Sequence, residues 1–208
     1  LPILLISKFG YRVIVHVHGS DFKNIFVNKY ISSLAKFLYK NCEIIIPSNH
    51  LRNDIKENLF KKVYLCENFV DQDLANYDDK INLITIKDEV FNVLWNSNII
   101  SSKGFFETLE AIDFLNNKGY NIKFFVLGEP LGDLELSRQN VIEKLNLYNQ
   151  KRWFDRHKVV KRINLKKILL NVNAVILPSS YPSECQPLSI IEGMIFCKHI
   201  IIKNTKAL

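Results

Sequence analysis

Two glutamates near the end of the chain, Glu184 and Glu192, have the chemistry and spacing to contact one ligand. Seven residues separate them, and on one continuous helix their side chains would point roughly 80° apart. A loop followed by a helix explains the spacing better, because Glu184 then reaches a cleft from the loop and Glu192 from the helix. Carboxylates accept hydrogen bonds from sugar hydroxyls. Two ordinary surface glutamates remain the alternative, since the spacing alone does not exclude them.

The residues between the two glutamates predict a helix N-terminus that could hold an anion. Pro187 suits the first helical turn, with Gln186 or a neighbour as the cap. The exposed amides of Leu188 and Ser189, helped by the helix dipole, would then bind phosphate. Hydroxyl-binding carboxylates beside an anion site favour a ligand that carries both hydroxyls and phosphates.

Other polar residues follow the predicted strands, where parallel sheets bind their ligands. His18 follows strand 11–17, and Gly128 ends strand 121–128. Lys103 ends the loop after strand 91–96, where its charge could meet a phosphate. A solvated lysine is the simpler alternative for Lys103, and ordinary turns and helix caps are the alternative for the whole set.

These residues depend on an alternation of apolar strands and amphipathic helices. The strands show little polar alternation, which is typical of parallel strands covered on both faces. The pattern therefore predicts an α/β fold with parallel sheets. The predicted strands are 11–17, 43–47, 62–67, 91–96, 121–128, 173–178 and 199–203, and the predicted helices are 27–40, 49–60, 104–118, 134–150, 164–171 and 188–196.

The acidic, turn-rich segment 68–90 breaks this rhythm and predicts a crossing between two sheets. We place the boundary near residue 88, which gives domains 1–88 and 89–208. The first domain has only three predicted strands and no opening glycine-rich turn, and the chain starts at Leu1, with Met194 as its only methionine. We therefore expect a fragment that lacks the N-terminal part of its first domain and the extreme C-terminus of its second.

Composition excludes several classes of protein. Of the 208 residues, 48% are hydrophobic and 24% charged, so the chain is not disordered throughout. No apolar run approaches the roughly 20 residues that span a bilayer. The four cysteines show no close pairing, which predicts reduced thiols in the cytoplasm rather than a disulfide framework or a zinc site.

The net charge of +7 is concentrated in the second half of the chain. Residues 91–208 carry 16 Lys and Arg against 10 Asp and Glu, a net charge of +6, and much of the excess lies in segment 151–167. Such a segment could face nucleic acid, anionic lipid or a phosphorylated substrate, or could simply be solvated. No nucleic-acid motif accompanies it, so we favour peripheral docking at the inner face of an anionic membrane.

The block 173–194, "NAVILPSSYPSECQPLSIIEGM", resembles the signature of the retaining glycosyltransferases called glycosyl transferases group 1. In that family a strand and "PS" lead to a glutamate, seven residues and a second glutamate. Further blocks resemble the family in the same order and cover nearly the whole chain: "VIVHVHGSDF", "IIIPSNHLRNDIKENL", "VYLCENFVD" and "VLWNSNIISSKGFFETLEAI". The resemblance implies a GT-B fold with two Rossmann-like parallel-sheet domains, the first of them incomplete here.

The resemblance also implies an activity. The second domain would bind a nucleotide-diphosphate sugar, and the sugar would pass with retention of configuration to a surface-glycan or lipid-linked acceptor. Glu184 would contact the sugar hydroxyls, Glu192 the ribose and Lys103 the diphosphate, while His18 would orient the sugar. No metal or other cofactor is implied. The expected donor-binding residues are Asn98, Gly128, Gln186, Pro187, Leu188, Ser189 and Glu192.

Several positions depart from the family pattern. Asn98 stands where many members have arginine, Lys198 stands near an expected glycine, and the glycine-rich loop of the first domain is missing. A catalytically inactive sugar-nucleotide-binding remnant therefore stays open as the alternative. The sequence Asp71-Gln72-Asp73 mimics a metal-binding Asp-x-Asp motif, but it falls in the crossover, so we interpret it as chance.

Overall fold

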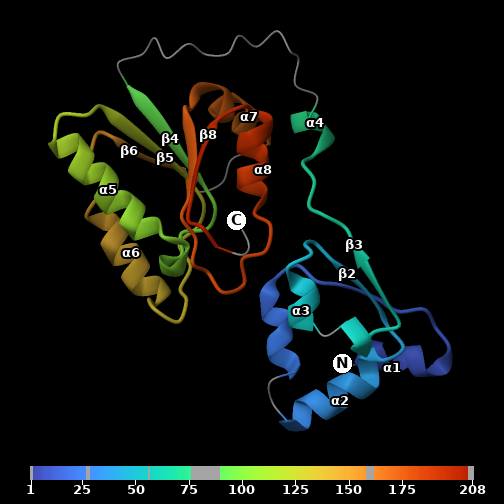
Figure 1. Cartoon of the computed structure of the whole chain (residues 1–208). Coiled ribbons are helices and arrows are strands. Elements are labelled where there is room, and N and C mark those ends of the chain that lie inside the picture. The colour runs from blue at the N-terminus through green and yellow to red at the C-terminus, as the bar shows by residue number, and fades with distance from the viewer. Residues whose placement is uncertain (1, 27–28, 56, 76–89, 158–161, 206–208) are drawn as a thin grey trace. The chain divides into compact units, whose positions relative to one another are not determined.

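The structure, a computed structural model, describes residues 2–26, 29–55, 57–75, 90–157 and 162–205 (Figure 1). The chain forms two compact units. The first contains the residues up to Asn68 together with Pro182–Pro187, and the second contains Phe69–Tyr181 and Leu188–Thr205. The predicted boundary near residue 88 lies outside the described residues, and each unit is described by itself below.

The first unit is built on a three-stranded parallel sheet in the order β1-β2-β3. Its strands are β1 (Ile14–His16), β2 (Glu43–Ile46) and β3 (Lys62–Leu65). Alternate residues of β1 and β2 enter a core with α2 (Lys29–Tyr39), in which Ile44 and Leu38 are almost fully buried. The remaining short helices are α1 (Pro2–Leu5), η1 (Ile6–Phe9), η2 (Ser20–Phe26), α3 (Leu51–Ile55) and η3 (Glu57–Leu59).

The second unit has a five-stranded parallel sheet in the order β6-β5-β4-β7-β8. The strands are β4 (Phe91–Asn96), β5 (Ile122–Leu127), β6 (Phe154–His157), β7 (Ala174–Leu177) and β8 (His199–Ile202). The helices are α4 (Gln72–Ala75), η4 (Ser101–Lys103), α5 (Phe105–Asn117), α6 (Arg138–Asn146), α7 (Arg162–Asn171) and α8 (Leu188–Ile195). Helices α5 and α6 lie on one side of this sheet and α7 and α8 on the other (Figure 1).

Aromatic packing fixes α5 against the centre of the second sheet. The ring of Phe105 contacts Trp95 of β4 at 5.0 Å and Phe124 of β5 at 6.0 Å between centroids. On the other face, a Cβ on Gly193 of α8 would lie 2.8 Å from Val175 of β7. The absent side chain therefore lets α8 approach the sheet closely.

The predicted α/β class with parallel sheets is confirmed, and all seven predicted strands are present. Strand β6 was not predicted. Its sequence Phe-Asp-Arg-His lies in the basic segment 151–167, and as an edge strand it needs no continuous apolar run. The predicted helix 134–150 is shorter than expected. It starts late because Ser137 caps α6 by accepting a hydrogen bond from the amide of Asn140, and it ends at Asn146. No described helix is long and apolar enough to cross a membrane.

Candidate functional site

The second sheet has a topological switch point beside its central strand. From β4 the chain passes through β5 to the edge strand β6, then returns to the other side of β4 through β7 and β8. The carboxyl ends of β4 and β7 therefore form the switch point, the position at which open α/β sheets bind ligands. The loops after these two strands meet, since the Ser180 amide donates to the Ser102 carbonyl at 2.8 Å.

Glu192 lies at this switch point. It belongs to α8, is only 9% exposed, and its Oε2 accepts a hydrogen bond of 2.7 Å from Nδ2 of Asn96, the last residue of β4. The helix thus brings the carboxylate to the carboxyl end of the central strand. A buried carboxylate beside a strand end has the chemistry to accept hydrogen bonds from ligand hydroxyls.

Lys103 places a positive charge between the loops after β4 and β7. Its Nζ donates to the Ser97 hydroxyl at 3.0 Å and lies 5.4 Å from the centroid of the Tyr181 ring. These contacts hold the side chain at the switch point. Lys103 and Glu192 therefore approach the end of β4 from two elements far apart in sequence.

Asp133 anchors the loop that carries Lys103, and sequence reasoning missed it. Its Oδ2 accepts hydrogen bonds from the amide and hydroxyl of Ser102 at 2.9 and 2.7 Å, and its Oδ1 accepts from the amides of Glu135 and Leu136. Burial would raise the pKa of Asp133, but these hydrogen bonds together hold the pKa below its ordinary value. Asp133 ends the polar loop "EPLGD" after strand 121–128, a position where ligand-binding residues are expected, but nothing in the nearby sequence indicated its contact with Ser102.

Gly128 permits close contact between the loops after β4 and β5. Its φ is +154°, and a Cβ there would lie 2.1 Å from the carbonyl oxygen of Ser97. No other residue fits this position without moving the backbone. The same Cβ would lie 3.2 Å from the Cα of Asn98, whose side chain is exposed. The predicted residues Asn98 and Gly128 are therefore neighbours at the carboxyl end of the sheet.

The division between the two units falls just before α8, between Pro187 and Leu188. Leu188 and Ser189 are the first residues of the helix and belong to the second unit, while Gln186 and Pro187 belong to the first. The side-chain oxygen of Gln186 accepts a hydrogen bond of 2.6 Å from the amide of Asn68, and the Asn68 side chain donates to the Gln186 carbonyl at 2.6 Å. Gln186 thus ties the loop to the segment after β3, a contact that the sequence did not suggest.

Within the first unit, the loop of Glu184 lies against the turn after β1. A Cβ on Gly19 would lie 3.1 Å from the Ser183 carbonyl oxygen. Cys185 enters the hydrophobic core, where burial and then the nearby Glu184 carboxylate raise the pKa of its thiol to about 11. His18, at the same turn, is exposed, and its ring lies 4.2 Å from that of His16. The structure therefore brings the Glu184 loop to the turn that carries His18.

The predicted residues accordingly form two groups. The first unit holds His18, Glu184, Gln186 and Pro187, and the second holds Asn98, Lys103, Gly128, Leu188, Ser189 and Glu192. Across the described part of the chain, no cluster of three or more His, Cys, Asp or Glu side chains has a metal-binding arrangement.

Comparison with known proteins identifies the fold. No family model and no curated protein matches the sequence. Among solved structures, HepE from Anabaena in complex with UDP is 14% identical with a TM-score of 0.70, over 98% of this chain and 57% of that one. Sucrose-phosphate synthase from Thermosynechococcus elongatus is 16% identical with a TM-score of 0.67, over 97% and 52%. A glycosyltransferase from Rickettsia africae is 18% identical with a TM-score of 0.63, over 99% and 55%.

The chain thus spans about half the length of the solved structures it matches. The α/β fold, with parallel sheets of three and five strands, matches that of these GT-B glycosyltransferase neighbours. At such low identity the likeness describes the fold alone.

Proposed function

We propose that this chain belongs to a glycosyltransferase that uses a nucleotide-diphosphate sugar as its donor. The observation that carries the proposal is that two charged groups bond to adjacent residues at the end of β4. The Glu192 carboxylate accepts from Asn96, and the Lys103 ammonium donates to Ser97 and lies beside the Tyr181 ring. A carboxylate suits ribose hydroxyls and a lysine suits a diphosphate. The UDP and UDP-glucose complexes of HepE support a donor of this class.

The second unit would bind the nucleotide end of the donor. Lys103 would neutralise the charge that develops on the diphosphate leaving group. The amides of Leu188 and Ser189 at the start of α8 would donate hydrogen bonds to the same phosphates. Gly128 lets the loops after β4 and β5 pack closely, so its role is to shape this end of the sheet.

The first unit would supply contacts to the sugar. Glu184 would accept hydrogen bonds from sugar hydroxyls, and His18 would orient the ring. The contact between the loop of Glu184 and the turn that carries His18 supports a shared task for these two residues. We further propose retention of the anomeric configuration and a surface-glycan or lipid-linked acceptor, as the family resemblance implies.

The decisive experiment is a transfer assay on the chain with a panel of nucleotide-diphosphate sugars. We expect turnover of at least one donor, with a product whose anomeric proton shows retention by NMR. Glu184→Gln should slow transfer by about 2–4 kcal/mol of activation free energy, because a charged contact to the reacting sugar is lost. Exposed Glu143→Gln, on α6, is the matched control. Wild-type turnover in Glu184→Gln would reject the role of Glu184.

The second candidate is a sugar-nucleotide-binding remnant without transfer activity. Asn98 favours it, because an exposed amide cannot neutralise a diphosphate as arginine would. Calorimetric titration with nucleoside diphosphates beside the transfer assay separates the two. Binding without turnover would support the remnant, and turnover would reject it.

Membrane association rests on the basic segment 151–167. Its described part includes exposed Arg152 and the Lys166–Lys167 pair at α7. Such charges favour an anionic bilayer, where a lipid-linked acceptor would lie. Neutralising the lysines of the segment should release the protein from vesicles containing phosphatidylglycerol, and unchanged binding would reject the proposal.

A further inference from the structure

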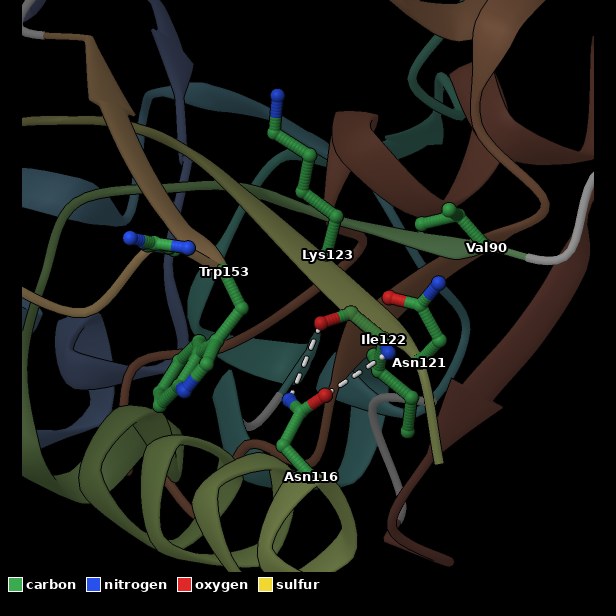
Figure 2. A pocket seen from close by; sticks show the side chains of 7 residues that line it. Val90, Asn116, Asn121, Ile122, Lys123 and Trp153 are labelled. Carbon is green, nitrogen blue, oxygen red and sulfur yellow. Dashed lines mark hydrogen bonds between the residues drawn. The ribbon is translucent and has the colours of Figure 1, made fainter. Parts of the chain in front are cut away.

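A pocket opens at the amino end of the second sheet, at the opposite end of β4 from Glu192 and Lys103. It has a volume of about 320 Å³ and lies where β4 and β5 begin (Figure 2). Its lining includes Asn116 of α5, Asn121 and Ile122 at the start of β5, and Arg152 and Trp153 before β6. Since β4 has six residues, about 20 Å of strand separates this pocket from the switch point.

Two polar side chains of this pocket, those of Asn116 and Lys123, are bonded to neighbouring residues of the sheet. The Asn116 side chain accepts from the amide of Ile122 at 3.0 Å and donates to its carbonyl at 3.1 Å (Figure 2). Lys123, the next residue along β5, forms an ion pair of 3.4 Å with Asp155. Both residues therefore hold the start of β5 in place.

Three other polar groups of the pocket are not bonded to any other residue that the structure describes. Within the described part of the chain, the exposed guanidinium of Arg152, the exposed side-chain amide of Asn121 and the indole N–H of Trp153 make no hydrogen bond or ion pair. The charged side chains nearby are already paired. Lys151 forms an ion pair of 2.8 Å with Asp113, and Lys123 forms one with Asp155. The pocket therefore keeps a positive charge, one side-chain amide and an indole N–H without a hydrogen-bond partner among the described residues, while the Trp153 ring packs edge-on against Tyr148 and Phe154.

We propose that this pocket binds a sugar residue that carries a carboxylate, such as a hexuronate within a glycan. The indole of Trp153 offers an apolar ring and a donor to a pyranose, and Asn121 can both donate to and accept from its hydroxyls. Arg152 matches a carboxylate with two parallel hydrogen bonds. A volume of about 320 Å³ accommodates one sugar ring with its water.

The geometry favours a glycan over single-stranded nucleic acid. Nucleic-acid grooves stack successive bases on several aromatic side chains, whereas this pocket presents one indole and has room for one ring. The proposal concerns a second site and does not depend on the proposed transfer reaction. If both hold, the pocket would retain an acidic glycan on the unit that binds the donor.

The two tryptophans of the chain provide the test. Trp95 is fully buried near the switch point, where its indole donates to the Ser97 carbonyl, and Trp153 lines the pocket. Each gives one indole signal in a ¹H–¹⁵N spectrum, and Trp153→Phe assigns them. We expect methyl β-glucuronide to shift the Trp153 signal with a Kd in the millimolar range, and the uncharged methyl β-glucoside to bind at least tenfold more weakly.

Variants then identify the residues. Arg152→Gln should weaken glucuronide binding at least tenfold and Asn121→Ala severalfold, whereas Lys144→Gln, an exposed cation on α6, should change nothing. Equal affinity for the two methyl glycosides, wild-type affinity in Arg152→Gln, or no shift of Trp153 would overturn the proposal. A single-stranded oligonucleotide that binds more tightly at Trp153 would overturn it in favour of nucleic acid. Failure of UDP to perturb the Trp95 signal would instead count against the proposed function alone.

Discussion

Replacing Asp133 by alanine should loosen the loop that carries Lys103. One carboxylate accepts four hydrogen bonds, two from Ser102 and one each from the amides of Glu135 and Leu136. Ser102 stands directly before Lys103, so the loss of Asp133 frees the loop where the ammonium is held. We expect both lower stability and weaker binding of a nucleoside diphosphate.

The size of the stability loss follows from the four contacts. A hydrogen bond to a charged acceptor contributes about 1.5–3 kcal/mol when it is shielded from water. The two from Ser102 are partly buried, whereas the Glu135 amide is exposed and regains a water molecule. Because the four hydrogen bonds share one acceptor group, their joint contribution to stability is smaller than four separate contributions would be. We therefore expect Asp133→Ala to lower the unfolding free energy by about 2–3 kcal/mol.

Urea denaturation at several pH values measures this effect. The pKa of Asp133 is lowered in the folded state, so its contribution is present above the unfolded value of about 4 and is lost as the pH falls through the folded value. The difference between wild type and Asp133→Ala should thus be largest near neutral pH and shrink in acid. Glu135→Gln, its exposed neighbour, is the control. Equal stability of wild type and Asp133→Ala at pH 7 would refute the reasoning.

Three further outcomes are expected. Gly128→Ala should destabilise the second unit by roughly 2–4 kcal/mol in thermal unfolding, because its Cβ would lie 2.1 Å from the Ser97 carbonyl oxygen; a wild-type melting temperature would contradict this. Glu192→Gln keeps an oxygen for Asn96 but should weaken binding of a nucleoside diphosphate about tenfold by calorimetry; unchanged affinity would remove Glu192 from the site. Transfer activity should survive EDTA, and its loss with recovery on adding Mg²⁺ or Mn²⁺ would show that a metal is needed.

Much of the fold could be predicted because its signals are local. Short β-branched runs such as 43–47 and 91–96 mark buried parallel strands wherever they occur, and polar residues after such strands collect at one sheet edge. The block from Glu184 to Glu192 likewise shows a loop that leads into a helix. The placement of Glu192 on α8 follows from that local pattern.

Other features could not be predicted, because they depend on contacts between distant residues. Asp133 and Ser102 are joined only after β4 and β5 pair, and Gln186 reaches Asn68 across more than a hundred residues. The edge strand β6 has a charged sequence that becomes a strand through its pairing with β5.

By itself the sequence determined the alternation of strands and helices, the parallel sheets and the identity of the residues at the strand ends. Apolar periodicity and helix caps act within a few residues, so they can be read directly from the chain. Only the tertiary structure decided that Pro182–Pro187 joins the first unit, and that Asn121 and Arg152 meet beside Trp153. These contacts join residues that are far apart in the sequence and become neighbours only when the sheets have formed, so no local pattern can reveal them.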